Sequence, residues 1–461
     1  MFEKRIYQER RRRLVDEIEN GLILLLGNTD SAFNSEGNCY RFRQDSSFLY
    51  FCGIDLPGFA LLLDVDSDKE VLFGPQQGMD DLIWSGLGAA LSDQAEAVGI
   101  CASAPFEQLG ERLQRVLKTG RSIHYLPSCR AENRILLKHL LEMSLAGIEE
   151  RVSRSLIRAV VTLRSVKGEE EIRELDEAAD LGHQLHTRAM RMAHEGVYEW
   201  EIAGELEALA ARSGRMLSFP PIVTVHGEIL HNHQRHHCLK NGDLLLVDAG
   251  VESAEHYASD HTRTLPVGGR FTARQRDIYQ LVFAGLGYAQ KVIRPGLFYR
   301  DIHLEVCRVL VSGLKSLGLM KGDVNEAVEA GAHALFMPHG LGHMLGLDVH
   351  DMEDLGEDAV GYGDSLDRST QFGLSRLRLA RRLEEGFVLT VEPGIYFIPG
   401  LVEKWRLSAL HEGFINYENV DEYLDFGGIR LEDDILVTSD GNRRLGKKIS
   451  LSINEVENYM G

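Results

Sequence analysis

Four carboxylates in strongly apolar surroundings constrain the second half of this chain more than any other feature. Asp248, Glu392 and Glu432 each end or interrupt an aliphatic run typical of a strand, within the segments 243–248, 387–392 and 427–437. Asp260 follows Asp248 at a distance that suits a hairpin of two short strands, so the two are predicted to lie side by side. Burying an ionised carboxylate costs several kcal/mol unless the group is paired or binds a metal. A single such acid could be a solvated strand end or a helix cap, but four of them each need compensation.

His343 adds an imidazole to this set, within the histidine-containing segment 336–351. One imidazole and four carboxylates form an oxygen-rich group of donors, which suits Mn²⁺ or a similar divalent ion better than thiolate-binding metals do. Four negative charges balance two divalent cations, and two adjacent ions can hold a hydroxide nucleophile and polarise a carbonyl. These residues therefore predict a site for two divalent metal ions.

The charge balance excludes some kinds of partner. The 461 residues include 50 Lys and Arg against 70 Asp and Glu, a formal net charge of −20. Such an excess repels phosphate backbones and acidic lipid surfaces, so we expect no nucleic-acid and no membrane partner. The length suggests roughly two or three domains.

The cysteines and apolar runs indicate a cytoplasmic protein. The six cysteines are widely spaced without a C-x-x-C pair, unlike those of a disulfide-stapled secreted scaffold. None has the surroundings of an activated thiolate. The charged first residues lack the apolar core of a signal peptide. The aliphatic runs are far shorter than the ~20 residues needed to span a bilayer.

The sequence pattern divides the chain into two domains. Residues 1–155 alternate between helices and short strands, the latter predicted at 22–27, 60–65 and 71–74. The pattern changes near residue 169, where helical spacing of apolar residues and an acidic outer face predict a long amphipathic helix. We therefore expect a smaller N-terminal α/β domain at 1–155 and a second domain at 156–461.

The second domain is predicted to be α+β, because its helical patterns are grouped apart from its strands. The helical patterns cover 169–212, 273–292 and 301–334. Residues 355–385 are weakly patterned, and residues 398–426 are expected to be an irregular insertion.

Five short motifs follow one another along residues 155–461. They are Val247-Asp-Ala-Gly250, Ser259-Asp-His-Thr-Arg-Thr264, His339-Gly-Leu-Gly-His-Met-Leu-Gly-Leu-Asp-Val-His350, Thr390-Val-Glu-Pro-Gly394 and Gly428-Ile-Arg-Leu-Glu-Asp433. In order and spacing they resemble the Xaa-Pro peptidases, the aminopeptidase P and prolidase group of dinuclear metallopeptidases. Residues 42–50 also resemble the N-terminal domain of that group. The resemblance implies a C-terminal pita-bread (creatinase/aminopeptidase-like) catalytic domain and an aminopeptidase P-like N-terminal domain.

The resemblance also implies a role for each metal ligand. Asp248 would chelate one ion, Asp260 and Glu432 would bridge both ions, and His343 and Glu392 would complete the other. Glu392 would in addition shuttle the proton of the bridging water, which requires a carboxylate within hydrogen-bond reach of the nucleophile. Mn²⁺ is the expected metal, with Co²⁺ or Zn²⁺ as alternatives.

Three histidines and Arg378 match positions around the substrate in this group, and Arg430 is a second candidate for binding substrate. His231, His339 and His350 would orient the scissile carbonyl or stabilise the oxyanion, although a lone histidine is more often structural. Arg430 shares a face of its predicted strand with Glu432 and would orient a metal carboxylate. Arg378 matches the arginine that holds a dipeptide's carboxylate in prolidases, and an exposed charge is the alternative.

The resemblance predicts an exopeptidase that hydrolyses the Xaa-Pro bond at the N-terminus of peptides, with a metal-bridging hydroxide as nucleophile. The segment 219–231 reads like the aminopeptidase P relatives, whereas Arg378 and the insertion at 398–426 resemble prolidases, which cleave only dipeptides. A non-catalytic binding protein or a metal-free creatinase relative is a third alternative, but both should lack the five ligands. Proline-containing peptides are the expected partners, and the chain is expected to form a homo-oligomer, a dimer or tetramer.

Overall fold

The computed structural model describes residues 1–86, 88–363 and 366–460, and these form two compact units. One unit contains residues 1–164 and 353–359, and the other contains residues 165–352 and 360–461. The division after residue 155 stays a prediction. Residues 364–365 of the weakly patterned segment 355–385 lie outside the described residues.

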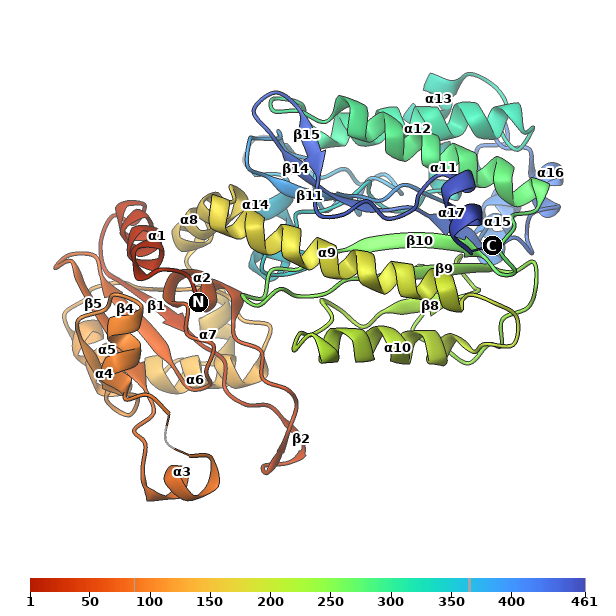
Figure 1. The fold of residues 1–461 in the computed structure, drawn as a ribbon. Helices are drawn as coiled ribbons and strands as arrows, with labels where there is room; N and C mark the ends of the chain where they lie inside the picture. Colours follow the sequence, from red (N-terminus) through yellow and green to blue (C-terminus); the bar gives the residue numbers. More distant parts are fainter. Residues whose placement is uncertain (87, 364–365, 461) are drawn as a thin grey trace. The chain divides into compact units, whose positions relative to one another are not determined.

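The smaller unit is built on a five-stranded mixed sheet (Figure 1). In spatial order its strands are β6 (Ser103–Pro105), β5 (Lys69–Gly74), β4 (Ala60–Asp64), β1 (Leu22–Leu26) and β7 (Ile123–Tyr125). The three strands predicted from aliphatic runs are thus present and pair as neighbours. A separate hairpin is formed by β2 (Ala32–Ser35) and β3 (Asn38–Cys39).

Helices accompany this sheet, and some of them complete its core. They are α1 (Lys4–Asp16), α2 (Ser46–Cys52), α3 (Met79–Trp84), α4 (Leu91–Ala97), α5 (Gln108–Lys118), α6 (Ala131–Leu141), α7 (Leu145–Glu150) and α8 (Arg154–Ser165), with η2 (Glu353–Leu355) from the later segment. Leu109 and Leu113 of α5 and Leu137 of α6 are buried against the sheet strands. One face of the sheet therefore packs on α5 and α6.

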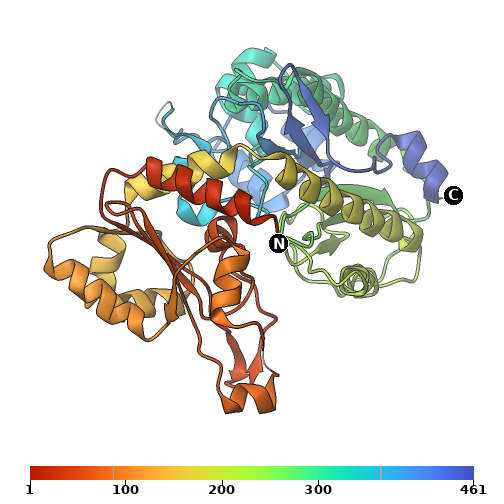
Figure 2. The same ribbon diagram turned by 60° about the vertical axis from the view of Figure 1, so that its left-hand side comes forward.

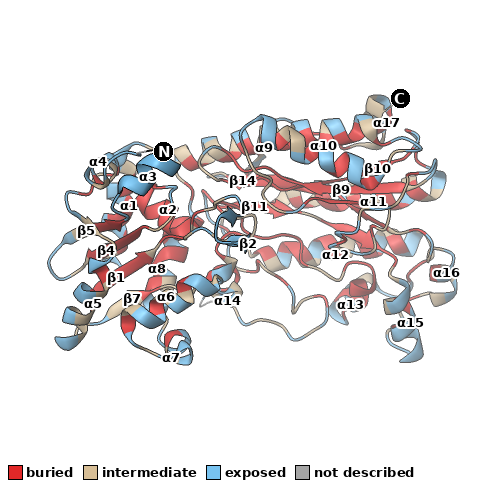
Figure 3. Ribbon diagram, turned by 90° about the horizontal axis from the view of Figure 1, so that it is seen from below, coloured by how far each residue is buried: buried red, intermediate tan, exposed pale blue. Residues whose placement is uncertain are grey.

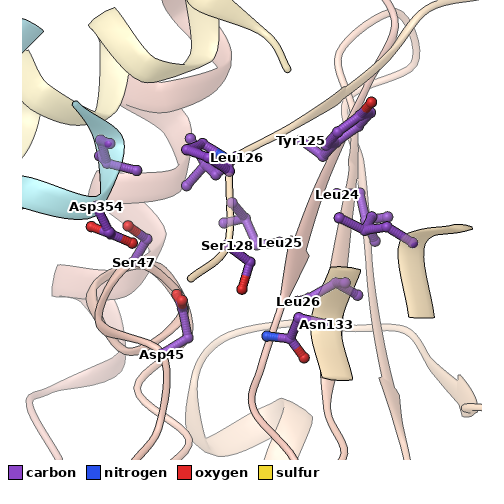
Figure 4. Close-up of a pocket in the computed structure, with 13 residues that line it drawn as sticks. Leu24, Leu25, Leu26, Asp45, Ser47, Tyr125, Leu126, Ser128, Asn133 and Asp354 are labelled. Atoms are coloured by element: carbon purple, nitrogen blue, oxygen red, sulfur yellow. The ribbon is translucent and has the colours of Figure 1, made fainter. Parts of the chain in front are cut away.

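The polar residues before the aromatic run 48–51 have a structural role. The Oδ1 atom of Asp45 accepts a hydrogen bond of 2.8 Å from the backbone N–H of Phe48, which caps α2. Asp45 and Ser47 also line a small cavity at the end of β1, together with Asp354 (Figure 4). This cavity holds none of the predicted site residues.

Small sheets form the centre of the larger unit. One has the order β10 (His261–Pro266), β9 (Leu244–Ala249) and β8 (Ile222–Thr224), a second has β11 (Val388–Val391), β14 (Asp433–Val437) and β15 (Asn442–Arg444), and a third pairs β12 (Gly394–Tyr396) with β13 (Gly428–Arg430). Every residue of β9 and β10 is buried, as Figure 3 shows in red. Polar side chains on these strands are therefore held away from solvent.

Helices flank these sheets. They are α9 (Glu169–Met192), α10 (Glu199–Arg212), α11 (Ala273–Val292), α12 (Tyr299–Ser316), α13 (Val324–Glu329), η1 (Ala332–Leu335), α14 (Glu357–Gly361), α15 (Pro399–Leu407), α16 (Tyr417–Asp421) and α17 (Ile453–Met460), with α14 divided between the two units. Helix α9 contacts β9 and β10, α10 contacts β8, and α11 lies alongside α12 (Figures 1 and 2). No described helix is long and apolar enough to cross a membrane.

Three predicted elements are divided or ordered differently. The helical pattern 169–212 forms two helices, because the chain turns between α9 and α10 through Gly196, whose φ of 90° suits glycine. The pattern 301–334 is likewise broken after α12, where Gly318 and Gly322 also have positive φ. The insertion 398–426 is not irregular throughout, since it contains α15 and α16.

The predicted strand 427–437 is also wrong as a single element. It consists of β13 and β14, which belong to different sheets and are separated by Leu431 and Glu432. The chain changes sheets at this point, and the backbone of Glu432 bonds to β10 rather than to either of those sheets.

Candidate metal centre and active site

The β9–β10 hairpin brings together the first two predicted ligands. The strands are antiparallel with Asp248 opposite Thr262, and Asp260 directly precedes β10. Both carboxylates are buried, with exposed fractions of 8% and 5%. Burial, followed by the nearby charge of Asp248, raises the pKa of Asp260 well above its ordinary value. The predicted hairpin return is confirmed.

Close backbone packing supports this hairpin. A side chain at Gly250 would begin 1.7 Å from the carbonyl oxygen of Ser259, so only glycine fits where the chain leaves β9. Glycine at this point lets the segment before Asp260 approach the end of β9.

Glu432 reaches the same place from the break between β13 and β14. Its backbone N–H donates to the carbonyl of Thr262 at 3.0 Å, and the Thr262 hydroxyl donates to Glu432 Oε2 at 2.6 Å. Burial, followed by the charges of Asp260 and Glu392, raises the pKa of Glu432 well above its ordinary value. Because the chain passes from one sheet to another at Glu432, the carboxylate of Glu432 lies beside those of Asp248 and Asp260.

His343 is oriented by its own backbone surroundings. Its Nδ1 lies 3.0 Å from the carbonyl oxygen of Met344, so a ring with the proton on Nδ1 donates there and directs the Nε2 lone pair toward the carboxylates. Nε2 lies 3.4 Å from Asp260 Oδ2 and 3.7 Å from Glu392 Oε1. One donor atom each from Asp260, His343 and Glu432 lies within 4.8 Å of the other two.

Glycine is again required next to this ligand. A side chain at Gly342 would begin 2.0 Å from the carbonyl oxygen of Thr390, because the loop runs directly against β11. The backbone N–H of His343 also lies 3.2 Å from Thr390 Oγ1, to which it donates. The loop that carries His343 and the strand β11 that leads into Glu392 are therefore held together where each supplies a predicted metal ligand.

Glu392 directly follows β11 and completes the group of five. Burial raises its pKa to about 7, and the charges of Asp260 and Asp248 act in the same direction, against His343 and Arg430. All five residues predicted as metal ligands are therefore brought to one centre.

The buried oxygens of this centre fit divalent cations. Asp248 Oδ1 and Asp260 Oδ1 are buried and have no hydrogen-bond partner among the described residues. Buried polar atoms are almost always bonded, and ionised carboxylates that repel one another need a counter-charge. Four carboxylates and one neutral imidazole form the donor set that hard divalent ions prefer.

Arg430 links the carboxylates to the substrate-side residues. Its Nη2 donates to Asp248 Oδ2 at 2.6 Å, its Nε to Thr262 Oγ1 at 3.2 Å, and its Nη1 to the Tyr396 hydroxyl at 3.1 Å. The Tyr396 hydroxyl lies 2.9 Å from His339 Nε2. A continuous hydrogen-bonded chain therefore runs from Asp248 to His339.

His339 is a neutral imidazole in this arrangement. Burial, followed by the charge of Arg430 and that of Arg378, lowers its pKa to about 3. Its Nδ1 lies 2.7 Å from the carbonyl oxygen of Gly340 and donates to it, which leaves Nε2 to accept from Tyr396. The Nδ1 atom is also 3.8 Å from Glu392 Oε2.

The other predicted residues lie around the same centre. The ring centroid of His350 is 4.3 Å from that of His343, with the planes at 76°. Burial, then the charge of Arg430 and also that of Arg378, lowers the pKa of His231, which is partly exposed. Arg378 itself lies in a bend and is half-buried. The structure therefore brings these residues together with the five carboxylate and imidazole donors.

The sequence analysis missed three supporting side chains. Tyr396 was not singled out, although it stands four residues after Glu392 in β12, the strand that pairs with the strand of Arg430. Asp434 accepts a 3.0 Å hydrogen bond from the Asp260 N–H, and Asp433 pairs with Arg263 at 2.7 Å. The run of acids at 432–434 was the available signal.

Comparison with known proteins agrees with this architecture. The family model for metallopeptidase family M24 matches residues 173–439, and the model for the aminopeptidase P N-terminal domain matches residues 7–125. A Xaa-Pro aminopeptidase of Escherichia coli (strain K12) is 32% identical over 465 residues, covering 98% of this chain and 97% of that protein.

Solved structures are similar over the whole chain. The proline aminopeptidase P II from Yersinia pestis matches with a TM-score of 0.81 at 30% identity, covering 100% of this chain and 99% of that one. The zinc-substituted aminopeptidase P of E. coli in complex with product matches with a TM-score of 0.81 at 31% identity, covering 100% and 98%. The predicted pita-bread domain with a smaller N-terminal α/β domain is thereby confirmed. The chain is a metallopeptidase of family M24 and belongs, within it, to the Xaa-Pro aminopeptidase family.

Proposed function

We propose that this enzyme removes the N-terminal residue from peptides whose second residue is proline, using two divalent metal ions. The observation that carries the proposal is the convergence of five donor side chains on one centre: the buried Asp248, Asp260, His343 and Glu432, and the partly buried Glu392. Relatives that match over nearly the full chain carry the name Xaa-Pro aminopeptidase.

These donors would hold two ions. We assign Asp248 to one ion, Asp260 and Glu432 to positions shared by both, and His343 with Glu392 to the other. Mn²⁺ is the proposed metal, because oxygen donors dominate the set. When bound, such a pair would supply a nucleophilic hydroxide at neutral pH and polarise the scissile carbonyl.

Glu392 is the proposed proton carrier. Its Oε1 faces His343 and its Oε2 faces His339, at 3.7 and 3.8 Å, so it stands between a metal ligand and a substrate-side histidine. From this position it can take a proton from water and give it to the proline nitrogen, which leaves as an amine.

The surrounding side chains are proposed to orient the peptide. His231 and His350 would bond to the scissile carbonyl and to the oxyanion that develops there. His339 would instead position the Tyr396 hydroxyl beside Glu392, since Tyr396 and Gly340 already engage both of its ring nitrogens. Arg378 is proposed to bind a carbonyl or carboxylate oxygen of the peptide.

A specialised pocket is needed because proline differs from other residues. Its nitrogen carries no N–H and its φ is fixed, so peptidases that pair with an extended substrate backbone bind it poorly. The dipeptidase alternative is not favoured by the named relatives. A non-catalytic binding protein is also disfavoured, because all five ligand positions carry metal-binding residue types.

Two further properties belong to the proposal. We propose a cytoplasmic location, supported by six free cysteines, and a homo-oligomeric state. Size-exclusion chromatography with light scattering tests the oligomer directly.

Substrate length tests the activity. Initial rates are compared on Xaa-Pro-Yaa tripeptides and on the matching Xaa-Pro dipeptides, with Mn²⁺ present and after chelation. We expect faster turnover of the longer peptides, loss of activity on chelation, and its return with Mn²⁺. Turnover confined to dipeptides would favour a prolidase instead, and metal binding without any turnover would favour a binding protein.

A further inference from the structure

A second cluster of metal-binding side chains lies in the larger unit, formed by residues that the proposed reaction does not use. His303 and Cys307 are four residues apart in α12 and therefore share a face of the helix. His333 joins them from η1, which packs against α12. One donor atom from each of the three lies within 4.8 Å of the others. The group therefore combines one thiol with two imidazoles.

The cluster is closed to solvent and poorly satisfied. The exposed fractions of His303, Cys307 and His333 are 0%, 0% and 2%. Among the described residues, Nδ1 of His303 has no hydrogen-bond partner, and neither ring nitrogen of His333 has one of good geometry, although the backbone carbonyl of Val328 interacts with His333 closely enough to act on its pKa. Such poorly bonded imidazoles are unusual in a protein interior, because a buried polar atom that loses its hydrogen bond destabilises the fold. The Val328 carbonyl can engage only one nitrogen of His333, so the other ring nitrogen is available to a ligand.

The spacing of the donors suits a tetrahedral ion. Cys307 Sγ lies 3.5 Å from His303 Nε2. Bond lengths of about 2.3 Å for Zn–S and 2.0–2.1 Å for Zn–N place the two atoms about 3.6 Å apart at a tetrahedral angle. The ring centroids of His303 and His333 are 6.1 Å apart, and the ring planes meet at 69°. Two rings at such an angle can each direct a nitrogen toward a common point more readily than two stacked rings can.

We propose that His303, Cys307 and His333 bind a thiophilic divalent cation, Zn²⁺, at a structural site separate from the carboxylate centre. A thiolate and two imidazoles select Zn²⁺ over Mn²⁺, which prefers oxygen. The fourth tetrahedral position falls to a ligand other than these side chains, such as a water molecule.

The two histidines are unprotonated near neutral pH, which favours metal binding. Burial lowers the pKa of His333 to about 4 and that of His303 well below its ordinary value, so both rings are neutral near pH 7. Burial raises the pKa of Cys307, so its thiol keeps its proton until a cation displaces it. Binding therefore releases one proton for each ion.

A bound ion would link helix α12 to the segment that leads into the active-site loop with His339 and His343. Residue His333 lies six positions before His339, and η1 leads directly into the segment that carries His339 and His343. Tyr299, one turn before His303 on the same face of α12, already donates to the carbonyl of Thr390 at 2.6 Å. A bound cation would add a second attachment between α12 and this region.

Cobalt spectroscopy tests the site in the full-length protein. Protein stripped with a chelator is first loaded with Mn²⁺, which fills oxygen-donor sites, and is then titrated with Co²⁺. We expect one equivalent of Co²⁺ to give a thiolate-to-cobalt charge-transfer band in the near ultraviolet and the visible bands of four-coordinate cobalt, and Zn²⁺ to abolish both. Cys307→Ser should lose the charge-transfer band. Cys52→Ser, which alters another fully buried thiol, should keep it.

Two outcomes would overturn the proposal: no charge-transfer band in the unaltered protein, or an equal band in Cys307→Ser. If Cys307→Ser does not fold, X-ray absorption of the zinc-loaded unaltered protein decides instead, since a sulfur shell at about 2.3 Å is expected. Its absence would show that the three side chains form only a hydrogen-bonded or water-filled cluster. The carboxylate centre has no sulfur donor, so these results are independent of the proposed peptidase activity.

Discussion

Arg430 Nη2 lies 2.6 Å from Asp248 Oδ2, in an ion pair whose two residues are 3% and 8% exposed. The same guanidinium also bonds to Thr262 and Tyr396. Arg430 therefore fixes a proposed metal carboxylate and a substrate-side hydroxyl with one rigid group. A lysine at this position would keep the charge but could not make these three bonds in the same geometry.

We predict that Arg430→Lys lowers kcat/KM by about 10–100-fold, because bonds to charged buried groups contribute roughly 1.5–3 kcal/mol each. Steady-state kinetics on a Xaa-Pro-Yaa peptide measures this. Arg382→Lys, at an arginine that lies in the larger unit and bonds to the carbonyl of Gly296, is the matched control. Equal kcat/KM values for the two variants would show that the hydrogen bonds of Arg430 do not support catalysis.

Asp260→Asn is expected to separate activity from stability. The amide cannot hold two cations as a carboxylate does, so activity should fall at least a thousandfold at ordinary Mn²⁺ concentrations. The metal-free variant should nevertheless be at least as stable as the metal-free parent at pH 8, because burial and Asp248 disfavour the charged form of Asp260. Urea denaturation in chelator measures the second effect. A marked loss of stability in the metal-free variant would contradict it.

The raised pKa of Glu392 gives a pH-dependent prediction for the metal-free protein. A group whose pKa rises from 4.5 in the unfolded chain to about 7 in the fold stabilises the fold below pH 4.5 and loses this contribution as the pH rises through 7. Buried histidines of lowered pKa change the stability of the fold with pH in the opposite direction. The effect of Glu392 is therefore measured as the difference in stability between the parent protein and a variant that lacks this carboxyl group.

Glu392→Gln should therefore gain stability relative to the metal-free parent between pH 5 and pH 8, measured by urea denaturation in chelator. With Mn²⁺ present, the stability gain of Glu392→Gln should shrink or become a loss, because the metal favours the ionised carboxylate of the parent protein. A difference that stays constant with pH in chelator would show that Glu392 titrates normally.

Lys167 and Asp351 form a second buried ion pair, with Nζ 2.9 Å from Oδ2 and both side chains 1% exposed. Asp351 directly follows His350, and its Oδ1 accepts from the Asp348 N–H at 3.3 Å. Removing one partner should leave a buried charge, so Lys167→Met is predicted to lower the free energy of unfolding by about 3–5 kcal/mol.

A double-mutant cycle with Asp351→Leu checks the coupling. The double variant should be more stable than the sum of the two single losses indicates, because the attraction between the two charges is then counted only once. Additive losses would mean that the two residues stabilise the fold through different contacts.

The convergence of these acidic side chains could be predicted from the sequence for a physical reason. Asp248 and Glu392 follow aliphatic runs that have few alternatives to a buried strand, and Asp260 is tied to Asp248 by a local hairpin. Such short-range constraints are visible in the order of residues. The roles assigned to the ten site residues remain predictions.

The parts that were not predicted depend on contacts between distant segments. Glu432 leaves its strand because its N–H bonds to Thr262, 170 positions earlier in the chain. Tyr396 acquires its partners His339 and Arg430 only when β12 pairs with β13. The helical spacing of His303 and Cys307 was visible, but nothing local indicated that η1 would bring His333 to them.

The most direct test of the central claim is the number of Mn²⁺ ions that the stripped protein binds. Isothermal titration calorimetry should give two equivalents per chain for the unaltered protein, since the thiol-containing cluster disfavours Mn²⁺. Glu432→Gln should lose at least one of them, because Glu432 is the proposed shared ligand. Binding of no Mn²⁺, or of the same two equivalents in Glu432→Gln with unchanged affinity, would contradict the account.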